Sequence, residues 1–89
     1  MTEMDKLKNL LSTARIPFEM QLIFDTPQIC YPTCEECICD AICHHWSYGH
    51  EEGLLEIMGL TENDDEVEGW LTAEEVFKRM EKHYKENNK

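Results

Sequence analysis

The apolar residues at the start of the chain recur at helical spacing. They form a single stripe that comprises Met4, Leu7, Leu10, Leu11 and Ala14. Thr2 precedes the stripe and is a residue type that caps helices, and Pro17 ends the segment because proline cannot donate a backbone hydrogen bond. The pattern therefore predicts a helix over residues 3–15.

The pattern then changes from helical spacing to period two. Between residues 18 and 24 the face made by every second residue is apolar, which is typical of a half-buried strand; it carries Phe18, Met20, Leu22 and Phe24. Residues 28–31 predict a second short strand that stops at Pro32, and residues 37–44 alternate again. The connections are short, so we expect an antiparallel three-stranded meander.

The second half of the chain predicts mostly helix. Residues 51–58 are expected to form a short helix that Gly59 ends, and residues 61–68 an acidic loop. Thr72 and Glu75 have the spacing of a capping box, which predicts a last helix over residues 73–84. The expected fold class is α+β, in the order α-β-β-β-α-α. Helices 3–15 and 73–84 should pack on the 18/20/22/24 face of the sheet, within one small domain, 1–89.

Charge changes this picture by restricting the partners. The chain has a formal net charge of −11, and no lysine or arginine occurs between Ile16 and Phe77, a stretch of 62 residues with 15 carboxylates. Such a stretch repels nucleic-acid phosphates and anionic lipid, and it attracts basic protein surfaces. We therefore expect no direct nucleic-acid binding and no membrane contact. No leader segment is visible at the start, so we expect a cytoplasmic protein.

Five cysteines lie within 14 residues: Cys30, Cys34, Cys37, Cys39 and Cys43. In a reducing cytoplasm they are expected to be thiols or metal ligands and not disulfides. Cys30, Cys34 and Cys37 have the spacing that radical-SAM enzymes use to hold an iron–sulfur cluster, although 89 residues cannot supply the barrel that those enzymes need. The candidate zinc ligands are Cys34, Cys37, Cys39 and His44, with Cys30 and His45 as alternatives. A second closely spaced ligand pair is missing, and small thiols on one strand face also suit a packed core. We therefore predict no cofactor, with zinc kept as the alternative.

The acidic segment admits two interpretations. Residues 64–75 have partial EF-hand spacing, with Asp64, Glu66 and Glu68 at the first, third and fifth positions and Gly69 at the sixth. Calcium is therefore a second possible metal, although glutamate is too long for the third and fifth positions. The other interpretation is a solvated loop that faces a partner. Its candidate partner-binding residues are Asp64, Asp65, Glu66 and Glu68.

Aromatic residues supply further candidates for a binding surface. Trp46 and Tyr48 lie in a short segment with Gly49, and Trp70 follows the acidic loop. Aromatic side chains in a glycine-containing loop suit a protein interface, and in a domain of this size they suit a lid over the core equally well.

Two stretches carry a resemblance. Residues 47–60, SYGHEEGLLEIMGL, and residues 69–77, GWLTAEEVF, with residues 40–44 ahead of them, resemble a group of short bacteriophage and prophage proteins carried in Gram-positive hosts. The resemblance covers roughly residues 40–80. It implies a phage-encoded accessory protein acting in the host cytoplasm, and it assigns no site residues.

The leading hypothesis is a non-enzymatic inhibitor or adaptor that binds a host protein. An acidic surface could occupy the basic nucleic-acid site of a host defence nuclease, such as a CRISPR effector, with carboxylates in place of phosphates. The alternatives are a small zinc- or calcium-binding regulatory module, a binder of a small nucleotide signal, and acidity that serves only solubility. An enzyme is not expected, because no nucleophile, base and orienting group stand together in the sequence. Homo-oligomerisation stays open.

Overall fold

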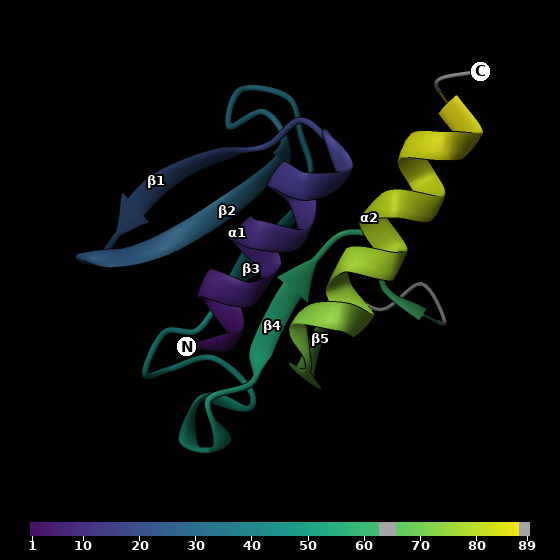
Figure 1. Cartoon of the computed structure of the whole chain (residues 1–89). Helices are drawn as coiled ribbons and strands as arrows, with labels where there is room; N and C mark the ends of the chain where they lie inside the picture. The colour runs from purple at the N-terminus through teal and green to yellow at the C-terminus, as the bar shows by residue number, and fades with distance from the viewer. Residues whose placement is uncertain (63–65, 88–89) are drawn as a thin grey trace.

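The computed structural model describes residues 1–62 and 66–87 and contains two helices packed on an antiparallel sheet (Figure 1). In chain order the elements are α1 (Glu3–Ala14), β1 (Glu19–Ile23), β2 (Thr26–Pro32), β3 (Cys37–Ile42), the 3₁₀ helix η1 (His50–Glu52), β4 (Leu55–Met58), β5 (Val67–Leu71) and α2 (Ala73–Asn87). The five strands form one sheet in the order β1-β2-β3-β4-β5. The expectation of three strands is therefore wrong, although the fold is still α+β.

Both long helices begin at the capping residues that the sequence indicates. The Asp5 N–H donates to the Thr2 hydroxyl over 3.1 Å at the start of α1. The Glu75 N–H donates to the Thr72 hydroxyl over 3.2 Å, and the Glu75 carboxylate accepts from the Thr72 N–H in return. These bonds satisfy backbone donors that have no partner inside the helix. The helices predicted over residues 3–15 and 73–84 are confirmed.

The core lies between the two helices and one face of the sheet. In Figure 1 α1 and α2 lie on the same face, with α1 against β2 and α2 against β4. Ile29, Ala41 and Ile57 form one cross-strand row on that face. The fully buried residues of the core are Leu7, Leu11, Ile29, Cys39, Ala41, Leu55, Ile57, Ala73, Val76 and Met80.

The two helices are joined to each other and to the sheet by polar contacts as well. The Ala73 N–H, at the start of α2, donates to the Glu3 carboxylate of α1 over 2.9 Å. This bond, followed by that from Lys6, lowers the pKa of Glu3. The Tyr31 hydroxyl of β2 lies 2.7 Å from Nδ1 of His83 on α2. α1 and α2 are thus joined by a direct hydrogen bond, although they lie far apart in the sequence.

The strand predicted over residues 18–24 exists as β1, but only Phe18 of its apolar face packs against the core, and the other three residues are exposed. Met20 is 40%, Leu22 70% and Phe24 73% exposed. The helices pack over β2 and β4, so β1 lies outside them at the edge of the sheet (Figure 1). The prediction that the helices bury this face is wrong, because alternating apolar residues show which side chains share a face of a strand but not which other elements pack on that face.

The helix expected over residues 51–58 is also wrong. Only one 3₁₀ turn forms, and β4 follows it, with Leu55 and Ile57 buried and Met58 exposed. Gly53 and Gly59 have positive φ angles of 72° and 89° and bracket the strand as turns. Within the described parts of the chain, no helix is long and apolar enough to cross a membrane.

Candidate functional site

Basic side chains are confined to one of the two layers of the molecule, where carboxylates such as Glu3 and Glu74 accompany them. Lysine and arginine are confined to the helical layer and its ends, whereas residues 17–72, which form the sheet and its connections, contain 13 carboxylates and neither basic residue type. Among the described residues only Arg79 crosses the layers in an ion pair, to Glu62 and Glu68. Most carboxylates of the sheet layer therefore have no cation beside them in the described structure.

The sheet face opposite the helices carries the centre of this acidic layer. The pairing registers place Glu19, Asp40 and Glu56 on this open face. The side-chain amide of Gln21 donates to that of Gln28, and the amide of Gln28 donates to Asp40 over 2.9 Å. Burial raises the pKa of Asp40, although hydrogen bonds from Met58 and Gln28 oppose the rise. The face thus carries a row of hydrogen-bonded polar and acidic groups, with apolar residues such as Ile42 and Met58 beside them.

The acidic segment near residue 66 is divided by the fold. Asp64 and Asp65 lie outside the described residues, and Glu66 is exposed. Glu68 belongs to β5 and forms two hydrogen bonds of 2.7 Å with Arg79. These bonds lower the pKa of Glu68 to about 2, so its carboxylate is occupied within the molecule.

The structural context of an EF-hand is absent from the described residues. β4 stands where the preceding helix was expected, and β5 occupies five of the expected loop positions. Gly69 has a different role: a Cβ added there would lie 2.2 Å from the Cβ of Tyr48. Glycine therefore allows β5 to approach the aromatic segment closely.

A bulge distributes the cysteines over both faces of the sheet. The register shift between Tyr31 and Pro32 pairs Cys37 with Pro32, on the open face, whereas Cys39 pairs with Tyr31 and lies in the core. Burial raises the pKa of Cys39 to about 12. The predicted set Cys34, Cys37, Cys39 and His44 is therefore not brought together. Among the described residues no group of three or more potential ligands is placed to hold a metal ion.

A different set of thiols meets on the open face. Cys30 is buried there, and burial, followed by hydrogen bonding with Cys34 and electrostatic interaction with Cys37 and Cys34, raises its pKa. The pKa of Cys37 is also raised, chiefly by burial. Raised pKa values favour protonated thiols, which are weak nucleophiles. The spacing of Cys30, Cys34 and Cys37 marks them as a possible ligand set in the sequence, but the bulge that turns Cys37 to the face of Cys30 is not visible there.

One thiol lies close to an imidazole. Sγ of Cys43 is 3.8 Å from Nδ1 of His50, and Cys43 lines a surface cleft of about 630 Å³ beside the start of α1. Burial raises the pKa of Cys43. An activated cysteine needs the opposite shift, so this pair lacks the electrostatics of a catalytic dyad.

A cluster of aromatic rings lies where the β1–β2 turn meets the segment after β3. This rim cluster comprises Phe24, His44, His45 and Trp46, with neighbouring ring centroids 4.2–5.7 Å apart. Trp46 is 72% exposed, whereas His44 is buried beneath the other rings. Sequence reasoning identified Trp46 but placed Phe24 in the core, because the turn that exposes it was taken as strand.

His44 holds an unsatisfied polar atom inside the rim cluster. Its Nδ1 accepts a hydrogen bond of 3.3 Å from the Trp46 N–H, so the proton of the neutral ring lies on Nε2. Nε2 is buried and has no partner among the described residues. Burial, and then repulsion from His45 and His50, lowers the pKa of His44. The cluster therefore presents a neutral donor that an incoming acceptor could satisfy.

The other predicted aromatic residues form a stacked pair. The rings of Tyr48 and Trp70 are 5.4 Å apart and nearly parallel, and both are exposed. The Trp70 N–H donates to the Tyr48 carbonyl over 3.3 Å, and the Tyr48 N–H donates to Glu56 over 2.9 Å. These bonds fix the aromatic segment against β4 and β5. Trp46, Tyr48 and Trp70 are thus displayed at the surface and do not form a lid over the core.

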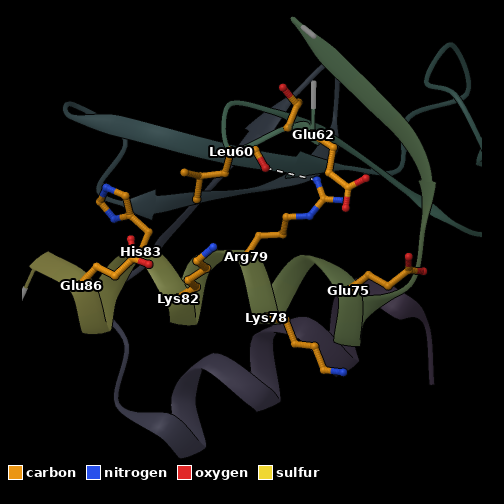
Figure 2. Close-up of a pocket in the computed structure, with 9 residues that line it drawn as sticks. Leu60, Glu62, Glu75, Lys78, Arg79, Lys82, His83 and Glu86 are labelled. Carbon is orange, nitrogen blue, oxygen red and sulfur yellow. Dashed lines mark hydrogen bonds and ion pairs between the residues drawn. The ribbon is translucent and has the colours of Figure 1, made fainter. Parts of the chain in front are cut away.

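The cleft along α2 is chemically mixed. It measures about 580 Å³ and is lined by Leu60, Thr61, Glu62, Glu75, Lys78, Arg79, Lys82, His83 and Glu86. Figure 2 shows Arg79 reaching from α2 toward Leu60, whereas Lys78 points to another side of the helix. Arg79 already bonds to the Leu60 carbonyl and to Glu68. The positive charge of Arg79 in this cleft is therefore already balanced within the molecule.

No protein-family model, curated protein or solved structure matches this chain.

Proposed function

We propose that this chain is a phage-encoded, non-enzymatic inhibitor or adaptor that binds a basic surface of a host protein through its acidic sheet layer. The observation that carries the proposal is the separation of charge: residues 17–72 hold 13 carboxylates and no lysine or arginine. The favoured target surface is a nucleic-acid-binding site, where protein carboxylates replace phosphates. The phage context comes from the resemblance of residues 47–60 and 69–77.

The exposed aromatic residues support a protein partner. Trp46, Tyr48 and Trp70 present large rigid rings at the surface, and Tyr48 and Trp70 line a shallow cleft together with Glu51 and Glu52 of η1. Tryptophan and tyrosine are enriched among the residues that contribute most to protein interfaces, and surrounding charges mainly raise the rate of encounter. The aromatic residues are thus the anchors in this proposal, and the carboxylates direct the approach.

Two matched charge variants test the proposal. Glu51→Gln with Glu52→Gln removes two negative charges from the sheet layer, and Glu74→Gln with Glu86→Gln removes two from exposed positions of the helical layer. A partner is first captured from host lysate, identified and purified, and its association rate with each variant is then measured. We expect the first pair to slow association several-fold and the second pair to change it little, because steering depends on where the charge lies.

Salt and a nucleic-acid competitor complete the test. Binding should weaken as salt rises, because exposed charges are screened beyond about 8–10 Å at physiological ionic strength. A duplex DNA oligonucleotide should compete with the chain for the partner. Salt-independent binding that the duplex does not displace, with equal association rates for both variant pairs, would refute nucleic-acid mimicry.

A further inference from the structure

β1 is an edge strand without the usual protection against pairing. It is one of the two edge strands of the described sheet, β5 being the other, and in Figure 1 its hairpin with β2 extends past α1. Natural edge strands commonly carry lysine, proline or a bulge that prevents another strand from adding. Residues 19–23 contain neither residue type, and β1 pairs with β2 without a register shift. The outer edge of β1 is therefore able to accept another strand.

The turn determines which backbone groups face outward. Phe24 and Asp25 form a two-residue connection with φ angles of 49° and 62°, as in a type I′ turn, and Ile23 pairs with Thr26 beside it. The residues that flank such a turn bond to each other, and alternate residues of β1 then bond to β2. The N–H and C=O groups of Met20 and Leu22 consequently point to the free edge.

The side chains on the core-side face of residues 18–24 are arranged symmetrically about Gln21, whereas Glu19 and Ile23 on the other face differ. Residues 18–24 read Phe-Glu-Met-Gln-Leu-Ile-Phe, with large apolar residues at equal distances on both sides of Gln21. If two copies paired antiparallel about Gln21, Met20 of each copy would lie opposite Leu22 of the other. The outward-facing backbone groups of these residues would then exchange hydrogen bonds. An isologous two-fold contact requires this kind of self-complementarity.

Charge does not oppose this register locally. Glu19 would face Ile23 of the other copy, so no two carboxylates on the strands would lie directly opposite each other. Gln21 would meet its own counterpart on the open face, at the end of the hydrogen-bonded row that runs through Gln28 to Asp40. The side chains of Met20 and Leu22, now 40% and 70% exposed, would become partly buried.

We infer that two copies of this chain form a dimer by antiparallel pairing of β1 about Gln21. The two five-stranded sheets become one continuous sheet, and the two acidic open faces lie on the same side of it. The inference is independent of the proposed function, because it rests on an edge strand and not on the acidic layer. The two interactions also respond to salt in opposite directions.

Sedimentation velocity of the purified chain over a range of concentrations tests the dimer. We expect a reversible monomer–dimer equilibrium that strengthens as salt rises, because each copy carries a net charge of −11 and the copies repel at long range. Leu22→Lys should weaken dimerisation by about tenfold or more, because it places a charge on the paired edge. Met58→Lys is the control, since Met58 is also exposed but lies on the interior strand β4. Circular dichroism verifies that both variants are folded.

The register is tested by two double variants. Met20→Lys with Leu22→Glu places opposite charges across the two-fold axis, whereas Met20→Lys with Leu22→Lys places like charges there. The Met20→Lys/Leu22→Glu variant should dimerise more strongly than the Met20→Lys/Leu22→Lys variant, even though its net charge is more negative and its copies repel each other more. A chain that stays monomeric at every concentration and salt, or a Leu22→Lys variant that dimerises as the parent does, overturns the inference. A like-charge variant that dimerises at least as well as the opposite-charge variant overturns the register.

Discussion

The ion pair between Glu68 and Arg79 should give the chain a stability that depends on pH. The pKa of Glu68 is lowered to about 2 from an ordinary value of 4.5. A carboxyl group whose pKa falls on folding stabilises the folded state above its unfolded pKa, and this contribution is lost as pH falls toward the folded pKa. The contribution is thus nearly complete above about pH 5, falls through the acid range and is mostly lost at about pH 2.

The size of the stabilisation follows from the pKa shift of Glu68 and from the exposed fractions of the Glu68 and Arg79 side chains. Each pKa unit corresponds to about 1.4 kcal/mol, so the full shift would be worth roughly 3 kcal/mol. The side chains of Glu68 and Arg79 are 23% and 17% exposed, and solvent screening reduces this to about 1–2 kcal/mol. Glu68→Gln should therefore lower the free energy of unfolding by about 1–2 kcal/mol at neutral pH.

Urea denaturation of parent and variant between neutral pH and about pH 2 measures the difference. The gap between the two unfolding free energies should narrow through the acid range and be mostly closed near pH 2. Glu62→Gln is the control: Glu62 lies 3.4 Å from Arg79 with a side chain that is 73% exposed, so its loss should change stability by less than about 0.5 kcal/mol. A constant gap between parent and Glu68→Gln across the whole range would contradict the argument.

Three further outcomes follow from contacts described above. Gly69→Ala should destabilise the fold by about 1–3 kcal/mol in urea denaturation, because the new Cβ would clash with the backbone and Cβ of Tyr48. An unchanged urea midpoint would show that the segment around Tyr48 can move aside without cost. Trp46→Ala should leave stability within about 0.5 kcal/mol while weakening partner binding by about 2 kcal/mol, measured by titration calorimetry on the purified partner. The purified chain should contain five free thiols and no stoichiometric zinc, with the fully buried Cys39 modified last by a thiol reagent; one zinc per chain by elemental analysis would refute this.

The elements with strong local signals were predictable from the sequence. α1 and α2 have capping residues and apolar stripes, and both form as expected. β4 and β5 were missed because each is only four or five residues long, and β5 buries a single residue, Leu71. Short strands of this kind become strands through pairing with distant residues, which local periodicity does not report.

The candidate site was predictable as a set of residue types but not as an arrangement. The acidic layer and the exposed aromatic rings were visible as composition and as a glycine-containing segment. Phe24 and Cys37 were placed on the wrong face, since one backbone turn and one bulge determine where their side chains lie. Glu68 was expected to face solvent, and only the packing of α2 against the sheet brings Arg79 to it.

The bond between Glu3 and Ala73 also limits the order in which the chain can fold. The carboxylate that satisfies a backbone donor at the start of α2 belongs to the first helix, 70 residues earlier in the sequence. During synthesis α1 and the β1–β2 hairpin leave the ribosome before α2 does. The core residues of these early elements are then still exposed to solvent. Contacts between such distant segments form late and slow the closing of a core. The nascent chain is therefore expected to stay open, with the core face of its early strands accessible to chaperones, until residues 73–87 have been made.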